Sequence, residues 1–138
     1  MKKCLEKFGV SEGLTDRELG RICKGHSRDF YEAIGMEYAS LDTSSAFGAF
    51  VFDLNFDVVP EELCGKFDLL TNFGTSEHVF NQYNNFKTAH DFVRKGGAFM
   101  HFMPFLGYVD HGYYSFQPCF YNDLAVANGY DILGMWLN

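Results

Sequence analysis

Residues 66–105 constrain the fold of this chain most, because their pattern predicts a strand, a helix and a second strand joined by short connections. The apolar run at 67–70 has the composition of a buried parallel strand, and it leads into a polar, small-residue segment at 71–76. A second apolar run, at 98–105, follows a Gly-Gly pair. Two strands joined through one helix form a βαβ unit, whose strands lie parallel in one sheet.

The helix between these strands has recognisable signals at both ends. We expect Ser76 to cap its start and Gly96-Gly97 to end it. Its apolar face is predicted from the near-helical spacing of Val79, Tyr83, Phe86, His90 and Val93. Ligand crevices in open α/β sheets lie beyond the carboxyl ends of the strands. Residues 72–78 and 104–111 should therefore share one rim of the sheet.

The composition indicates a globular chain. Its 138 residues fit one domain, and 47% of them are hydrophobic against 21% charged. The net charge of -7 does not favour a nucleic-acid partner, because binding the phosphate backbone usually needs a basic face. Aromatic residues make up 18% of the chain, and we expect some of these rings to line a pocket or a contact surface.

Cysteine spacing and the first residues bear on the compartment. Cys4, Cys23, Cys64 and Cys119 lie far apart and form no C-x-x-C pair, so neither a zinc ribbon nor a redox motif is supported. The start MKKCLEKFGV has the lysines of a secretory leader without its apolar region. No run reaches the roughly 18 apolar residues of a membrane span. We therefore expect a soluble, cytoplasmic protein with reduced thiols and no membrane partner.

The flanking segments predict further short elements. Thr15 and Glu18 form a capping box that should start a helix, Gly25 should interrupt that helix, and Ser27 should cap its continuation. Apolar runs predict strands at 36–41 and 49–54. The few residues between these strands are too short for an ordinary parallel crossover, so we expect a hairpin or a sharply bent connection.

The C-terminal part is expected to contain a long irregular segment between two more elements. Residues 107–118 are dense in Tyr, Gly and His, which is typical of a lid or substrate loop. A helix is predicted at 120–127, ended by Asn128-Gly129, and a last strand at 130–137.

Several segments resemble the class I S-adenosylmethionine-dependent methyltransferases, in particular a bacterial methyltransferase-like branch. In chain order they are SRDFYEAIGMEYASLD, GAFVFDLN, FDLLTNFGTSEHVFNQ, RKGG, PFLGYVDHG and FYNDLAVANGY. The resemblance covers residues 27–130. It implies an α/β fold with a Rossmann-like, doubly wound and mostly parallel sheet, in a single methyltransferase-like domain over residues 1–138.

The resemblance implies S-adenosyl-L-methionine as the cofactor. Asp42 stands where the family has the acidic residue that binds the ribose, and a carboxylate can accept hydrogen bonds from two vicinal hydroxyls. The residues that would border the adenine are Asp53, Leu54 and Asn55. Those that would lie under the methionine part and the transferring methyl are Asn72, Phe73 and Gly74.

One part of the family pattern is missing. The segment at 8–13 has two glycines but no apolar strand ahead of them, so we expect the usual first strand and Gly-rich turn to be lacking, and the domain to be incomplete at its N-terminal end. Asp42 and Asp53 could also be ordinary strand-end turn residues, because Asp bonds to its own backbone there. Asn72-Phe73-Gly74 could likewise be a tight turn.

Other candidate site residues come from their chemistry alone. His78 could act as a general base, or it could be a capping or surface histidine. Tyr108 and His111 could contact substrate, although an aromatic loop can also pack over the edge of a core. A metal cluster can be imagined from Glu77, His78, His101 and His111. These residues lack the close paired spacing of a helical or hairpin site, so we expect no metal.

Two functions follow as hypotheses from different classes. The first is an S-adenosylmethionine-dependent methyltransferase-like protein acting on a small polar metabolite. The second is a non-catalytic methyltransferase-fold remnant or interaction module that binds no cofactor. In the second case, another copy of the chain or a partner chain would cover an exposed sheet edge.

Overall fold

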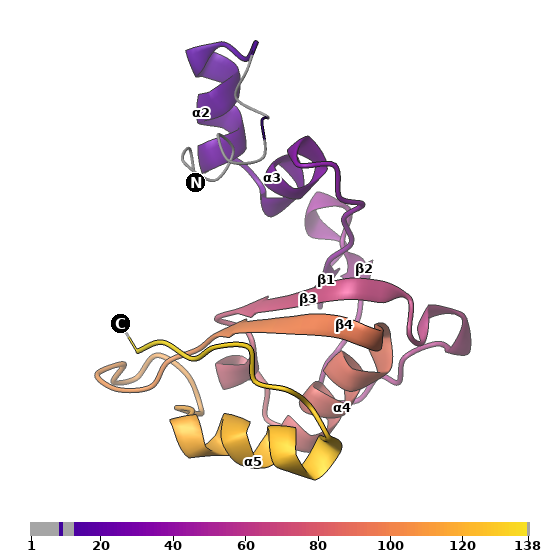
Figure 1. The fold of residues 1–138 in the computed structure, drawn as a ribbon, viewed down its shortest axis with the longest axis vertical. Coiled ribbons are helices and arrows are strands. Elements are labelled where there is room, and N and C mark those ends of the chain that lie inside the picture. Colours follow the sequence, from indigo (N-terminus) through magenta and orange to yellow (C-terminus); the bar gives the residue numbers. More distant parts are fainter. Residues whose placement is uncertain (1–8, 10–12, 138) are drawn as a thin grey trace. The chain divides into compact units, whose positions relative to one another are not determined.

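The computed structural model describes residues 9 and 13–137, which form two compact units. We call them the N-terminal unit, which ends at Phe52, and the C-terminal unit, which begins at Asp53. The fold is mixed α/β, and the described residues form four α-helices and two small parallel sheets (Figure 1). The single methyltransferase-like domain expected over residues 1–138 stays a prediction. The predicted loss of a first strand concerns a segment that lies largely outside the described residues.

The N-terminal unit begins with helix α2 (Asp16–Lys24), which starts as predicted from the N-cap Thr15. The capping box is formed, since the Thr15 N–H donates to Glu18 Oε2 at 2.8 Å and the Glu18 N–H donates to Thr15 Oγ1 at 3.3 Å. Gly25 caps the end of α2, which confirms the predicted interruption. The apolar cluster of this unit consists of Leu19 and Ile22, with Leu14, Phe30, Ala33 and Ile34 packed against them.

Helix α3 (Ser27–Ala33) follows at once, and its cap differs from the prediction. The N-cap is His26 rather than Ser27, because His26 Nδ1 accepts a hydrogen bond from the Arg28 N–H at 3.3 Å. An imidazole nitrogen can thus replace the hydroxyl oxygen that helix starts usually use.

Strands β1 (Leu41–Asp42) and β2 (Phe50–Val51) are much shorter than predicted and pair in parallel. The connection between them bends sharply through the 3-10 turn η1 (Ala46–Gly48). Of the two expected alternatives, a hairpin and a sharply bent connection, the structure has the second. Phe47 and Gly48 take φ angles of 55° and 73° there. Two successive residues in the left-handed region turn the chain within a few residues.

The C-terminal unit contains the predicted βαβ unit. Strand β3 (Phe67–Phe73) pairs in parallel with β4 (Val93–Phe102), and helix α4 (Gln82–Phe92) connects them. The register places Leu69 opposite Ala98, with an irregularity before that pair. A short 3-10 turn, η2 (Glu61–Leu63), precedes β3.

The boundaries of the central helix differ from the prediction. Ser76 does not cap it, because residues Ser76–His78 form a separate 3-10 turn, η3, and α4 starts after the N-cap Asn81. Asn81 Oδ1 accepts a hydrogen bond from the Asn84 N–H at 3.1 Å. The helix ends at Phe92, so Gly96-Gly97 lie in β4. A Cβ on Gly97 would lie 3.0 Å from the Asp68 carbonyl oxygen, which explains a glycine in this strand.

The buried face of α4 also differs from the prediction. The buried residues of the helix are Asn85, Thr88, Ala89 and Phe92. The predicted apolar face is therefore wrong at Tyr83 and His90, which are exposed. The buried residues recur at i, i+3, i+4 and i+7 from Asn85, so the buried stripe is one position away from the predicted one.

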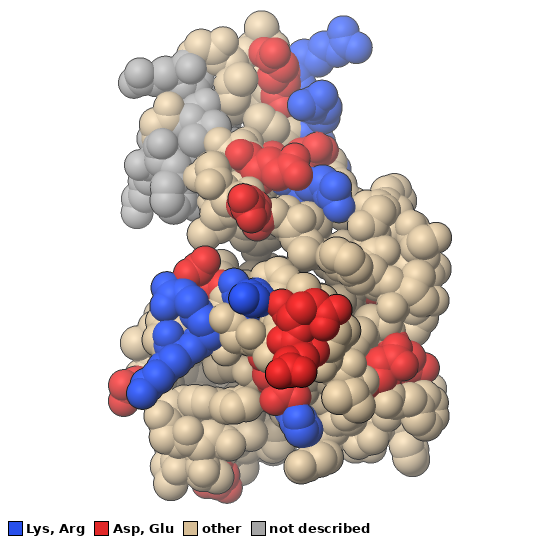
Figure 2. Space-filling view, turned by 90° about the vertical axis from the view of Figure 1, so that its right-hand side faces the viewer, with Lys and Arg blue, Asp and Glu red and all other residues tan. Residues whose placement is uncertain are grey.

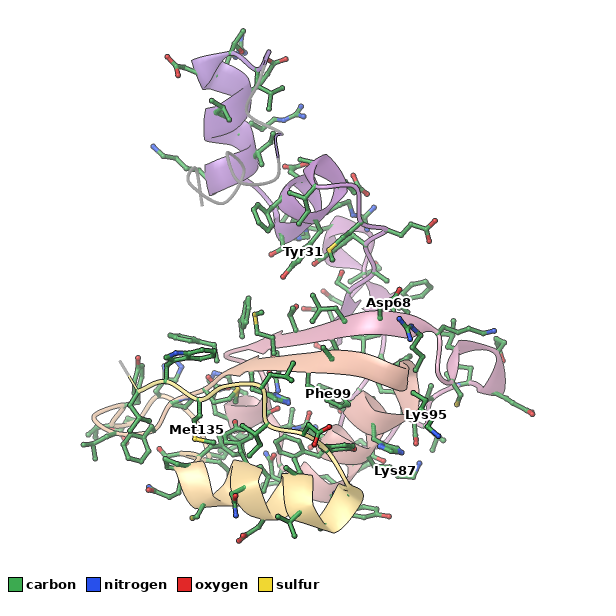
Figure 3. All side chains as sticks on the ribbon, in the orientation of Figure 1. Tyr31, Asp68, Lys87, Lys95, Phe99 and Met135 are labelled. Carbon is green, nitrogen blue, oxygen red and sulfur yellow. The ribbon has the colours of Figure 1, made fainter. Side chains whose placement is uncertain are left out.

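Helices α4 and α5 (Pro118–Asn128) lie on the same side of the β3–β4 sheet (Figure 1). Aromatic rings fill the space between them, with Phe86 of α4 at 4.9 Å from Phe120 of α5 between ring centroids. Phe99 of β4 lies on this side too (Figure 3). Gly129 caps α5 in the left-handed conformation, as predicted.

The other predicted C-terminal element is absent. Residues 130–137 form no strand, and their large apolar side chains, such as Leu133 and Trp136, are exposed. Residues 103–117 are irregular, which includes all but the last residue of the irregular segment expected at 107–118. No helix of the described ranges is long and apolar enough to cross a membrane. Acidic and basic side chains form separate small groups among uncharged residues on the face drawn in Figure 2.

Candidate functional site

The two segments that were predicted to share a rim do lie together at the carboxyl edge of the β3–β4 sheet. The Gly74 N–H donates to the Phe102 carbonyl oxygen at 3.0 Å, which joins the ends of the two strands. A pocket of about 180 Å³ opens here between residues 72–78 and residues 104–111. We call these two segments together the rim. The lining of the pocket includes Phe73, Gly74, Glu77, Pro104, Tyr108 and His111.

Glu77 is the buried centre of the rim, with a side chain 1% exposed. The loop after β4 packs directly onto it, since the Tyr113 N–H donates to the Glu77 carbonyl oxygen at 2.7 Å. A Cβ on Gly112 would lie 2.8 Å from Glu77 Cγ, and one on Gly74 would lie 3.3 Å from Glu77 Oε1. Because these two positions are glycines without a Cβ, there is room for the Glu77 side chain.

Two histidines face the Glu77 carboxylate from different segments. Nε2 of His111 lies 3.4 Å from Glu77 Oε1, and Nε2 of His78 lies 3.8 Å from the same oxygen. The two imidazole rings are 5.1 Å apart between centroids, and each side chain is about half exposed. The other carboxylate oxygen, Glu77 Oε2, is buried and has no hydrogen-bond partner among the described residues.

A buried hydrogen-bond network around Ser76 holds the backbone next to Glu77 in place. The Ser76 side chain is fully buried, and its Oγ accepts from the side-chain amides of Asn72 and Asn85, the latter at 2.7 Å. The Gln82 side chain donates to the Ser76 carbonyl oxygen at 2.7 Å. These bonds tie η3 to β3 and α4, so the backbone on each side of Glu77 is fixed.

His101 belongs to this network rather than to the histidine pair. Its Nδ1 lies 3.2 Å from Asn72 Nδ2, and an amide NH₂ can only donate, so Nδ1 is the acceptor. Burial lowers the pKa of His101 to about 4, which keeps the ring neutral. Tyr121 packs on the ring at 5.5 Å between centroids. Burial, and then the negative charge of Glu77, raise the pKa of the Tyr121 hydroxyl.

A second pocket, of about 650 Å³, adjoins His78. His78 and Tyr113 line it together with Asn55, Phe80 and Asn81. Asn55 joins the loop after Asp53 to the start of α4, since its Oδ1 accepts from the N–H groups of Phe80 and Asn81 at 2.9 and 3.0 Å. The cluster of Glu77, His78 and His111 therefore borders both pockets.

The structure brings most of the sequence-predicted site residues into the C-terminal unit. Phe73, Gly74, Tyr108 and His111 line the smaller pocket, and His78 lines the larger one. Asn72 lies beneath the rim in the buried network.

The adenine-side candidates are held by internal hydrogen bonds. Asp53 Oδ1 accepts from the Asn55 N–H at 2.8 Å, and the Leu54 carbonyl oxygen accepts from the Asn84 side chain at 3.0 Å. Asp42 belongs to the N-terminal unit, where its Oδ1 accepts from Ser44 Oγ and N–H, both at 2.8 Å. These bonds, the side-chain bond first, lower the pKa of Asp42. Both aspartates thus form the turn-type bonds expected of strand-end residues.

Glu77 is the residue whose importance the sequence reasoning missed. The sequence named Glu77 only as a member of an imagined metal cluster and gave no sign of its burial, whereas its side chain is 1% exposed in the structure. The available signal was its position between Ser76 and His78 in a polar segment, opposite a second histidine on the same predicted rim.

Comparison with known proteins gives no independent indication of identity. No protein-family model, no curated protein and no solved structure matches this chain. Any function proposed for this chain is therefore based on the residues of the rim.

Proposed function

We propose that this protein is a methyltransferase-like protein that binds S-adenosylmethionine at the rim and acts on a small polar metabolite. The observation that carries the proposal is the pocket at the carboxyl edge of parallel strands β3 and β4, lined by residues of both following loops. This edge is where open α/β sheets bind ligands. A Rossmann-like, doubly wound arrangement is part of the proposal, and the parallel pairing within each unit supports it.

The residues of the rim fit one end of such a cofactor. A pocket of about 180 Å³ is smaller than the roughly 300–1,000 Å³ of ordinary ligand sites, so it would take the methionine end beside Phe73 and Gly74. The positive φ of 72° at Gly74 brings the backbone close to that pocket without a Cβ. The Asn55 side chain fits a supporting role better than adenine contact, because both its ends already form hydrogen bonds.

The chemistry required of the chain is modest. The cofactor would supply a methyl group activated by its sulfonium, whose departure leaves a neutral thioether. The protein then has mainly to align the acceptor, and positioning alone can lower a barrier by roughly 7–11 kcal/mol. In the proposal, Tyr108 and His111 contact the acceptor, and His78 takes its proton. The Glu77 carboxylate, 3.8 Å from His78 Nε2, would stabilise the resulting imidazolium.

A specific observation favours the alternative of a non-catalytic interaction module. The side of the β3–β4 sheet away from α4 and α5 carries large apolar residues that are about half exposed within the protein. Their exposed fractions are 53% for Phe73, 50% for Met100 and 59% for Phe102. A contiguous apolar sheet face of this kind can also bind another chain.

Calorimetric titration of the full chain with S-adenosylhomocysteine tests the proposal. We expect saturable, micromolar binding that Phe73→Ala weakens at least tenfold, which is about 1.4 kcal/mol. Tyr83→Ala is the matched control, since Tyr83 is an exposed aromatic residue on α4, 79% accessible. Asp42→Ala tests the predicted ribose contact in the same assay.

The absence of saturable heat would overturn the proposal and favour the interaction module. Equal weakening by Phe73→Ala and Tyr83→Ala would also count against it, because binding would then not depend on the rim.

A further inference from the structure

We propose that Glu77, His78 and His111 bind a divalent transition-metal ion, for which Zn²⁺ is the probe. The three side chains come from the η3 turn and from the loop after β4, which the fold brings to one point. Their candidate ligand atoms all lie within 4.8 Å of one another. This proposal goes beyond cofactor binding and replaces the sequence-based expectation of no metal. With the ion bound, His78 and His111 are ligands, and His78 no longer acts as the base.

One of the ligand–ligand distances is that expected around a zinc ion, and another is slightly longer. Zinc binds nitrogen and oxygen at about 2.0–2.2 Å, so two ligands in a tetrahedral arrangement lie about 3.3–3.6 Å apart. Glu77 Oε1 lies 3.4 Å from His111 Nε2 and 3.8 Å from His78 Nε2. Small rotations of the half-exposed imidazoles would complete the geometry without moving the buried carboxylate.

Burial of Glu77 is a second, independent observation. Its side chain is 1% exposed, and Oε2 is buried without a hydrogen-bond partner among the described residues. An ionised carboxylate is costly to bury unless a cation or several donors compensate it. In the described part of the chain its ion-pair partners are two histidines, which carry charge only when protonated. A bound dication would supply the missing compensation with the imidazoles neutral.

The surrounding backbone is shaped to bring the ligands together. The N–H groups of Tyr113 and Tyr114 donate to the Glu77 carbonyl oxygen at 2.7 and 3.3 Å, and this anchors the loop that carries His111. Gly112 permits that approach, because a Cβ there would lie 2.9 Å from the same carbonyl oxygen. The loop can therefore rest on Glu77 only with a glycine at this position.

The ligand set determines which ions fit and what they could do. Two imidazoles and one carboxylate suit zinc, iron, cobalt or nickel, and they leave coordination positions open. Open positions would face the two pockets, because His78 lines the larger and His111 the smaller. A small molecule with an oxygen or nitrogen donor could then bind the ion directly from either pocket.

Metal titration of the full chain, without an affinity tag of histidines, tests the site. The chelator-treated protein is titrated with Zn²⁺ by calorimetry and with Co²⁺ by absorption, whose ligand-field bands report the coordination number. We expect one ion per chain and cobalt bands of a four- or five-coordinate site. His111→Ala and His78→Ala should each weaken Zn²⁺ binding at least tenfold.

His90→Ala is the matched control, because His90 is an exposed histidine on α4. Glu77→Gln keeps the volume of the side chain and should also weaken binding, and circular dichroism checks that it folds. Zn²⁺ binding that is absent, or equal in wild type, His111→Ala and His78→Ala, overturns the site. The titration contains no S-adenosylhomocysteine, so its outcome and that of the cofactor titration are separate.

Discussion

Lowering the pH should destabilise the C-terminal unit through His101. This ring stacks on Phe99 and packs against Phe86 and Tyr121, and its Nδ1 accepts a hydrogen bond from Asn72. A protonated ring would lose that acceptor and leave a charge in an apolar site. Burial accordingly lowers the pKa of His101 from 6.5 to about 4.

The sign of the effect follows from proton binding in the two states. Between pH 6.5 and about 4 the unfolded chain binds a proton at His101 that the folded chain does not. The free energy of unfolding is therefore unaffected by this group above pH 6.5 and falls as the pH drops towards 4. At about 1.4 kcal/mol per pKa unit, the largest loss is about 3 kcal/mol.

Urea unfolding followed by circular dichroism across this pH range measures the effect. The variant His101→Gln keeps an acceptor for Asn72 but cannot titrate, so its stability should lack this part of the pH dependence. The control His90→Gln removes an exposed histidine and should keep the wild-type slope. A wild-type stability that does not change across the range, or a slope that persists in His101→Gln, would refute the reasoning.

Three further substitutions test the packing described above. Ser76→Ala leaves two buried asparagine amides without their shared acceptor and should lower the free energy of unfolding by about 1–3 kcal/mol in urea titrations. Gly112→Ala would place a Cβ 2.8 Å from Glu77 Cγ, so it should displace the loop and alter the amide spectrum of the rim. Thr15→Ala removes the capping box with Glu18 and should cost about 1 kcal/mol, seen as faster hydrogen exchange in α2.

Helix ends were predicted correctly where the capping residue and its hydrogen-bond partner lie close together in the sequence. The capping box at Thr15 and the C-cap Gly129 are such cases, because each bond partner lies within a few residues. The βαβ unit was also predicted, since two apolar runs with a helix between them allow few other topologies. The shared rim follows directly from that parallel pairing.

Predictions failed where distant residues decide the structure. Ser76 has the side chain of a helix cap, but Asn72 and Asn85 bind its hydroxyl, and the helix starts later at Asn81. The apolar run at 130–137 pairs with no strand of the described structure.

The site shows the same division between local and distant signals. Phe73, Gly74 and His111 were placed on the rim by the order of strands and loops alone. Glu77 and His111 come together because backbone N–H groups of the loop donate to the Glu77 carbonyl oxygen. The spacing of residues in the sequence does not predict these hydrogen bonds. The sequence therefore indicated which segments meet at the rim better than it indicated which side chains contact one another there.

The most direct test of a ligand site at the rim is an amide ¹H–¹⁵N NMR titration of the full chain with S-adenosylhomocysteine. The account predicts saturable shifts at Phe73, Gly74 and His111, with α5 residues such as Val126 unchanged. Shifts that are absent at saturating ligand, or that are confined to segments away from the rim, would contradict it.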